Sequence, residues 1–140
     1  MPIYLSSAAK AKLNFRFPAA FNGGRIDVYT GPQPAGSDFA PTGSRIATVT
    51  APGGLQFILA GMVASKDPAQ IWTLQGVGTG VAGWFRLVAD PNDPGYVSND
   101  YIRLDGLCWP LADPHTGLVL PALSITPETT RPIDGFNFSV

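Results

Sequence analysis

The residue types that most often carry out catalysis are scarce in this chain, whose 140 residues include one cysteine and one histidine. Cys108 and His115 lie close in sequence, and a thiol beside an imidazole can act as nucleophile and base. Cys108, however, falls in the apolar run 107–111, where a thiol usually packs as a small hydrophobic group. A single cysteine also leaves a disulfide or a cysteine-based zinc site without partners. We therefore predict no catalytic residue and no enzymatic activity.

Aspartates are concentrated in one third of the chain, at Asp90, Asp93, Asp100, Asp105 and Asp113. Paired carboxylates support acid/base hydrolysis in many glycosidases. Most of these aspartates border Gly or Pro, where the carboxylate commonly hydrogen-bonds the backbone of its own turn. The stretch 90–95 also lacks the oxygen-ligand spacing of a calcium loop. The sequence thus predicts turn-stabilising aspartates, and neither a metal ion nor a cofactor.

A glycine-rich segment, 76–83, contains the spacing G-x-G-x-x-G from Gly78 to Gly83. In nucleotide-binding folds such a segment leads into a helix whose N-terminus holds the phosphates. Here it leads into Trp-Phe-Arg-Leu-Val, which is a strand pattern, so the nucleotide interpretation fails on context. Glycines that enter a strand more often mark a bulge or a close approach of two backbones.

The composition indicates which elements position these residues. The chain has 16 Gly, 14 Pro and a single Glu, so helix-building residues are scarce and turns are frequent. Alternating apolar and polar positions between the turns predict about nine short strands, over 10–17, 25–30, 45–50, 55–60, 71–75, 81–88, 101–105, 118–123 and 136–140. Only 61–70 is expected to hold a helical turn. We predict one all-β domain over residues 1–140, an antiparallel β-sandwich of jelly-roll-like form.

The charge is unevenly distributed, although the formal net charge is only −1. Residues 1–50 carry five basic and two acidic groups, and three of the basic groups, Lys10, Lys12 and Arg16, share one face of the strand expected over 10–17. Residues 1–22 are thus a possible basic arm, or simply a solvated strand face. The overall balance argues against nucleic-acid binding. With no long apolar run and no secretory signal pattern, we expect a protein that neither crosses a membrane nor is secreted.

Three stretches in order are similar to a family of small virion proteins of tailed bacteriophages. They are Gly23-Gly-Arg-Ile-Asp-Val-Tyr-Thr-Gly-Pro-Gln-Pro34, Ala40-Pro-Thr-Gly-Ser-Arg-Ile-Ala-Thr-Val-Thr50 and Gly78-Thr-Gly-Val-Ala-Gly-Trp-Phe-Arg-Leu87. The length and the all-β character look most like the cement, or decoration, protein of a phage head. The resemblance implies a structural protein without a cofactor, made in the host cytoplasm and located on the outer surface of the capsid. There it would clamp neighbouring major capsid protein subunits, as a dimer or trimer.

Contact residues for such a clamp are expected in the basic arm and among exposed aromatic and strand-edge positions. The expected capsid or subunit contacts are Lys10, Lys12, Arg16, Trp84, Arg86, Phe136, Phe138 and Val140. An alternative for the last strand is that its apolar face simply joins the core. An alternative function is a tail-associated adsorption or carbohydrate-binding module, in which Trp72, Trp84, Trp109 and the tyrosines form a sugar-stacking platform.

Overall fold

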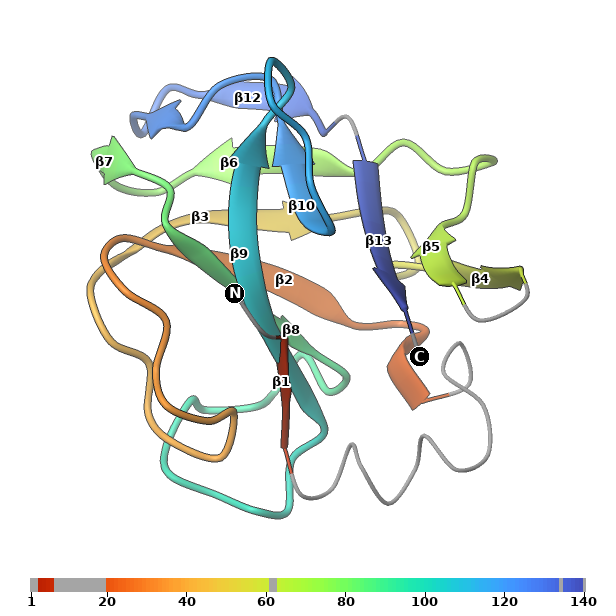
Figure 1. Cartoon of the computed structure of the whole chain (residues 1–140), viewed down its shortest axis with the longest axis vertical. Helices are drawn as coiled ribbons and strands as arrows, with labels where there is room; N and C mark the ends of the chain where they lie inside the picture. Colours follow the sequence, from red (N-terminus) through yellow and green to blue (C-terminus); the bar gives the residue numbers. More distant parts are fainter. Residues whose placement is uncertain (1–2, 7–19, 61–62, 134, 140) are drawn as a thin grey trace.

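The computed structural model (Figure 1) describes residues 3–6, 20–60, 63–133 and 135–139. Its strands are β1 (Tyr4–Leu5), β2 (Arg25–Tyr29), β3 (Arg45–Thr50), β4 (Phe57–Ala60), β5 (Val63–Lys66), β6 (Thr73–Gly76), β7 (Gly80–Val81), β8 (Trp84–Val88), β9 (Arg103–Pro110), β10 (Gly117–Leu120), β11 (Ser124–Ile125), β12 (Thr130–Pro132) and β13 (Gly135–Ser139). The main sheet runs in the order β12-β6-β3-β2-β8-β9-β10-β13-β5-β4. In addition β1 pairs with β9, and β7 and β11 form a small separate sheet.

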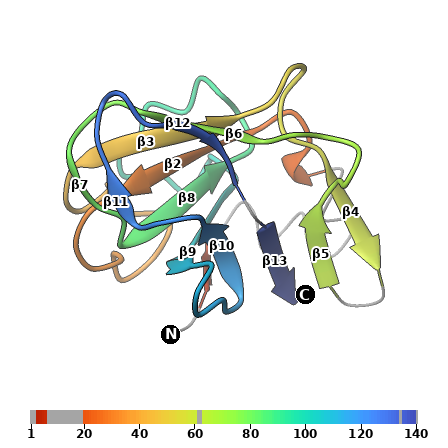
Figure 2. The same ribbon diagram turned by 90° about the horizontal axis from the view of Figure 1, so that it is seen from above.

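The main sheet curls back on itself, so that its β12-β6-β3-β2 part lies across the core from its β10-β13-β5 part (Figure 2). The fold is therefore all-β and sandwich-like, as the sequence predicts. It departs from a purely antiparallel arrangement at one place, because β10 runs parallel to β9, with Leu118 beside Cys108. The chain leaves β9 at Pro110, passes through a turn and an exposed loop, and re-enters the sheet in the same direction at Gly117.

Most of the predicted strands are confirmed, and one prediction is wrong. The segment 61–70, expected to hold a helical turn, contains β5, which pairs with both β4 and β13. Its residue Ala64 is completely buried while Val63 is 41% exposed, which is the alternation of a half-buried strand. Pro68 falls in the turn that follows β5. The short strands β1, β11 and β12 were not expected, and the strand predicted over 10–17 lies outside the described residues.

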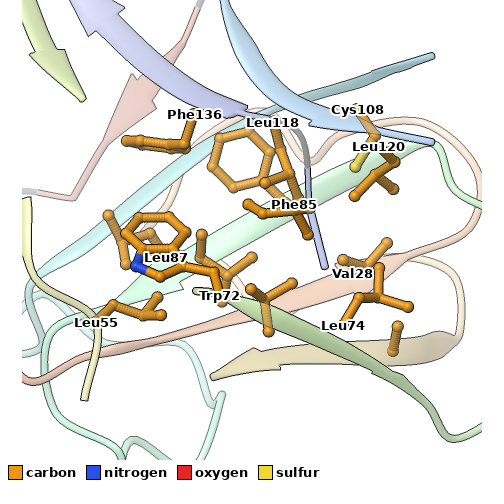
Figure 3. Close-up of a cluster of buried hydrophobic side chains, with 14 of the residues drawn as sticks. Val28, Leu55, Trp72, Leu74, Phe85, Leu87, Cys108, Leu118, Leu120 and Phe136 are labelled. Atoms are coloured by element: carbon orange, nitrogen blue, oxygen red, sulfur yellow. The ribbon is translucent and has the colours of Figure 1, made fainter. Parts of the chain in front are cut away.

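Aromatic rings fill the centre of the core (Figure 3). The Phe136 ring lies 5.6 Å from Phe57 and 5.7 Å from Phe85, both in edge-to-face geometry, and Phe57 packs in the same way on Trp72 at 5.2 Å. Edge-to-face contacts of this kind stabilise a core beyond the area they bury. The last strand, β13, therefore closes the core through Phe136 and Phe138, which are 2% and 7% exposed.

Candidate functional site

Strand β8 is buried on both of its faces. Phe85 and Leu87 pack in the core, and because side chains alternate along a strand, Trp84 and Arg86 point to the opposite face of the sheet. Both are nevertheless buried, with 0% and 1% of their surface exposed. The 30–44 loop and the 89–102 loop, which lie next to each other in Figure 1, cover this outer face. The Trp84 ring also stacks on Tyr29, with the ring centroids 4.5 Å apart.

An ion pair is buried on this outer face, between neighbouring residues of β8 and β9. Arg86 lies directly opposite Asp105 in the strand register. Its Nε donates to Asp105 Oδ1 at 2.8 Å and its Nη2 donates to Oδ2 at 2.9 Å, with both side chains at most 1% exposed. Burial raises the pKa of Asp105 above its ordinary value, against the opposing effect of the hydrogen bonds from Arg86. The guanidinium is thus the main group that offsets the cost of burying this carboxylate.

A second buried ion pair connects β9 with the 89–102 loop. Arg103 donates from Nε and from Nη2 to the two carboxylate oxygens of Asp93, at 2.6 Å in each case. The Gly95 N–H donates to the same carboxylate at 2.9 Å. Burial acts to raise the pKa of Asp93, but the hydrogen bonds from Arg103 and Gly95 outweigh it, so this pKa lies below its ordinary value of 3.8. The carboxylate is therefore ionised at neutral pH.

The two arginines also hold the 30–44 loop. Arg86 Nη1 donates to the Phe39 carbonyl at 2.8 Å, and Arg103 Nη1 donates to the Ser37 carbonyl at 3.2 Å. The Ser37 hydroxyl in turn donates to the Tyr4 carbonyl at 2.6 Å. The hydrogen bonds from the two guanidinium groups are charge-assisted, and such bonds are stronger than neutral ones. Each arginine therefore bridges a carboxylate and a loop carbonyl, which fixes both loops on the sheet.

These loops carry an exposed apolar patch, which we call the loop patch, formed by Phe39, Tyr96 and Val97. They are 52%, 72% and 68% exposed. The Ser98 N–H donates to the Asp38 carbonyl at 2.8 Å, so the backbone beside Val97 touches the backbone beside Phe39. The patch is thus one surface built from two loops.

The charged residues within the two loops that carry the loop patch are all acidic. Residues 30–44 and 89–102 include Asp38, Asp90, Asp93 and Asp100 but no lysine, arginine or histidine. Asp93 is neutralised by Arg103, whereas Asp90 and Asp100 are exposed. An apolar centre with an acidic rim fits a partner surface that is apolar in the middle and basic around it.

The structure places the predicted contact residues elsewhere than on an exposed surface. Trp84 and Arg86 lie between the sheet and the two loops, in what we call the second buried layer, and Phe136 and Phe138 belong to the core. These four side chains are therefore buried within the chain itself. A buried side chain presents no surface to a partner, so the prediction that these four residues make capsid or subunit contacts is wrong. The other four predicted contacts, Lys10, Lys12, Arg16 and Val140, lie outside the described residues.

The predicted sugar-stacking platform loses two of its three tryptophan rings, because Trp72 and Trp84 are both 0% exposed. Trp109 is partly exposed, and its ring centroid lies 4.2 Å from that of His115. A stacking platform needs exposed neighbouring aromatic faces. Trp72 instead packs on Phe57 in the core, and its Nε1 donates to Gln70 Oε1 at 2.9 Å.

Cys108 and His115 do not form a nucleophile and base. Cys108 is buried beside Leu120 in the core (Figure 3), and burial raises the pKa of its thiol, the opposite of what a reactive thiolate needs. His115 packs on Trp109, the neighbour of Cys108 in β9, whose side chain points to the other face of the strand. His115 Nε2 lies 3.1 Å from Asp113 Oδ1 on the exposed surface. The interpretation of Cys108 as a core residue is confirmed.

The interpretation of the aspartates as turn residues holds for Asp90 and Asp93 but is wrong for Asp105, which lies in β9 and pairs with Arg86. The interpretation of the glycines holds. Asp90 accepts a hydrogen bond from the Asn92 N–H at 2.9 Å, within its own turn. A Cβ atom on Gly83 would lie 2.3 Å from the Gly31 carbonyl oxygen, and one on Gly76 would lie 1.9 Å from the Thr126 carbonyl oxygen. The glycine-rich segment therefore permits close approach of backbones.

No group of three or more His, Cys, Asp or Glu side chains in the described ranges is placed to hold a metal ion. Those ranges also hold no helix long and apolar enough to cross a membrane. Comparisons of the chain with protein-family models, with curated proteins and with solved structures each gave no match. The fold and the site together define an all-β, sandwich-like domain, with two loops that buried ion pairs fix on its sheet.

The loop patch was not found by sequence reasoning, although one signal for it exists. Arg86 and Arg103 each stand inside an otherwise apolar strand pattern, where a charged side chain requires an acidic partner. Asp93 and Asp105 are the aspartates that meet this requirement. The exposed residues Tyr96 and Val97 follow Asp93 after Pro94 and Gly95 and are carried by the loop that Asp93 anchors.

Proposed function

We propose that this chain is a structural virion protein that binds the outer surface of a phage capsid and clamps neighbouring major capsid protein subunits. The observation that carries the proposal is the loop patch, an exposed apolar surface whose two loops are fixed by buried ion pairs. A surface that is ordered before binding loses less conformational entropy when it binds. The sequence resemblance to small phage virion proteins supports the choice of partner.

A clamp of this kind works through repetition. Many copies on a symmetric shell, each making a modest contact, hold the shell more strongly than one contact does. We expect the capsid site to be apolar at its centre and basic at its rim, because the loop patch has the complementary character. The binding should weaken as salt is added, since exposed charges are screened.

The experiment mixes purified protein with shells assembled without it and measures bound protein after sedimentation. The expected result is saturable binding in a fixed ratio to the capsid protein. Replacing Phe39 and Tyr96 by Ser should weaken binding about 30-fold for each residue that acts as an anchor of about 2 kcal/mol. Ile71→Ser is the matched control, because Ile71 is 72% exposed, as Tyr96 is, and belongs to neither loop.

Two outcomes contradict the proposal. One is the absence of binding at low salt, and the other is equal binding by the Tyr96→Ser and Ile71→Ser variants. Replacing Lys10, Lys12 and Arg16 by Ser tests the basic arm separately. A few copies located at the tail, instead of hundreds over the head, would favour the adsorption module.

A further inference from the structure

The two strands that end the main sheet differ in how they are protected. β12 has the sequence Thr-Arg-Pro, so it presents a charge and a proline that cannot donate a hydrogen bond. Both features are typical of edges that avoid pairing with another chain. β4 has the sequence Phe-Ile-Leu-Ala, with neither a charge nor a proline. Ile58 and Leu59 of β4 are also 40% and 45% exposed.

The backbone of β4 offers one donor and one acceptor at this edge. The Asp67 N–H donates to the Gln56 carbonyl at 3.0 Å, so Gln56, and with it Ile58, turns its backbone groups toward β5. Phe57 turns the other way, since its N–H donates to Asn22 Oδ1 at 2.9 Å. By the same alternation the N–H and C=O of Leu59 lie in the plane of the sheet and point away from β5. No described residue makes a hydrogen bond with them there.

We propose that β4 pairs antiparallel with β4 of a second copy of this chain, about a twofold axis beside Leu59. Such pairing is self-complementary: the Leu59 N–H of each copy donates to the Leu59 carbonyl of the other. The Asn22 cap on Phe57 disfavours registers that need the Phe57 N–H. The pairing deepens the expectation of a homo-oligomer within the proposed function.

Side chains and charges favour a second copy as the partner. In the proposed register the two Leu59 side chains meet across the axis. β4 has no charged residue, so no like charges meet there. The nearby Lys66 ammonium donates to the Asp67 and Gln70 carbonyls, which holds it back against its own chain. One strand pair is a small interface, so we expect a weak dimer, with Kd of about 10–100 μM.

The test is made without shells, so that its failure can be told from the failure of capsid binding. Sedimentation velocity of the full chain up to about 0.5 mM, well above the expected Kd, should show a monomer–dimer equilibrium. Leu59→Lys should abolish the dimer by placing two ammonium groups at the axis. Val77→Lys is the matched control, because Val77 is 48% exposed and lies away from β4, and it should dimerise like the wild type.

Two further variants keep the proposal falsifiable if Leu59→Lys disturbs folding. An equimolar mixture of Leu59→Lys and Leu59→Glu chains should recover the dimer. Leu59→Cys should form an intermolecular disulfide under mild oxidation, because the Cα atoms of such a pair lie about 5.5 Å apart, whereas Val77→Cys should not. A wild-type chain that stays monomeric at the highest concentration, or equal cross-linking at positions 59 and 77, would overturn the proposal.

Discussion

Removing the guanidinium of Arg86 tests whether the outer face of β8 is held as described. Arg86→Met keeps an unbranched side chain of similar length but deletes the two hydrogen bonds to Asp105 and the one to the Phe39 carbonyl. Asp105 is 0% exposed, so its carboxylate loses its main compensating charge in a buried position. Breaking a buried pair by removing one partner costs about 3–5 kcal/mol.

For a chain of this length, 1 kcal/mol corresponds to a change of about 3 °C in Tm. We therefore expect Arg86→Met to lower Tm by about 10–15 °C in a thermal unfolding experiment at pH 7. The loss should shrink as the pH falls. The pKa of Asp105, which burial already raises, rises further without Arg86, and the protonated carboxyl carries no charge to compensate.

A double variant separates the charge from the loop contact. Arg86→Met with Asp105→Leu removes both charges and should regain most of the lost Tm. The Phe39 carbonyl still lacks its donor, so amide hydrogen exchange in the 30–44 loop should stay faster than in the wild type. Asp113→Asn is a control at an exposed pair, His115 and Asp113, and should leave Tm nearly unchanged. A Tm for Arg86→Met within about 3 °C of the wild type, roughly 1 kcal/mol, would refute this reasoning.

Two other predictions concern ionisable groups. Because the folded-state pKa of Asp93 is below 3.8, its ion pair stabilises the fold above that pH and stops doing so as the pH falls through the lowered pKa. Asp93→Asn should thus be less stable than the wild type by about 3 kcal/mol in urea unfolding at pH 7, and the difference should shrink below pH 3.8; a constant difference would contradict this. Cys108 should resist alkylation in the native protein at pH 8 and react fully in denaturant, whereas rapid modification of the native chain would show that the thiol is not buried as described.

The sequence predicted the strands well where their partners lie near in sequence or their pattern is regular. The alternation in 25–30 and 45–50 identifies β2 and β3, and the Gly and Pro clusters identify the turns between strands. At 61–70 the pattern is four residues long and lies between Gly61 and Pro68, too short to separate a strand from a turn. The pairing of β5 with β4 and β13 makes this segment a strand, and its partner β13 lies far away in the sequence.

The second buried layer was beyond sequence reasoning for a related reason. The strand pattern over 81–88 puts Trp84 and Phe85 on opposite faces of one strand, but nothing in the local sequence says that both faces are covered. The cover comes from contacts between distant residues: Arg86 with the Phe39 carbonyl, and Arg103 with the Ser37 carbonyl. Loops rich in Gly, Pro and Asp are typical of connections between strands at the protein surface. In this structure the two loops also cover a network of buried ion pairs.

The two proposed surfaces lie far apart on the molecule, which bears on how they would work together. β8, which carries the loops, is separated from β4 by β9, β10, β13 and β5 in the sheet. With about 4.8 Å between neighbouring strands, this separation is roughly 24 Å along the curled sheet. In Figures 1 and 2 the 30–44 loop and β4 lie at opposite sides of the view. A dimer joined at β4 would therefore leave both loop patches uncovered and directed outward. Such a dimer has two identical contact surfaces at a fixed separation, which is the geometry required of a protein that holds two neighbouring subunits of a shell.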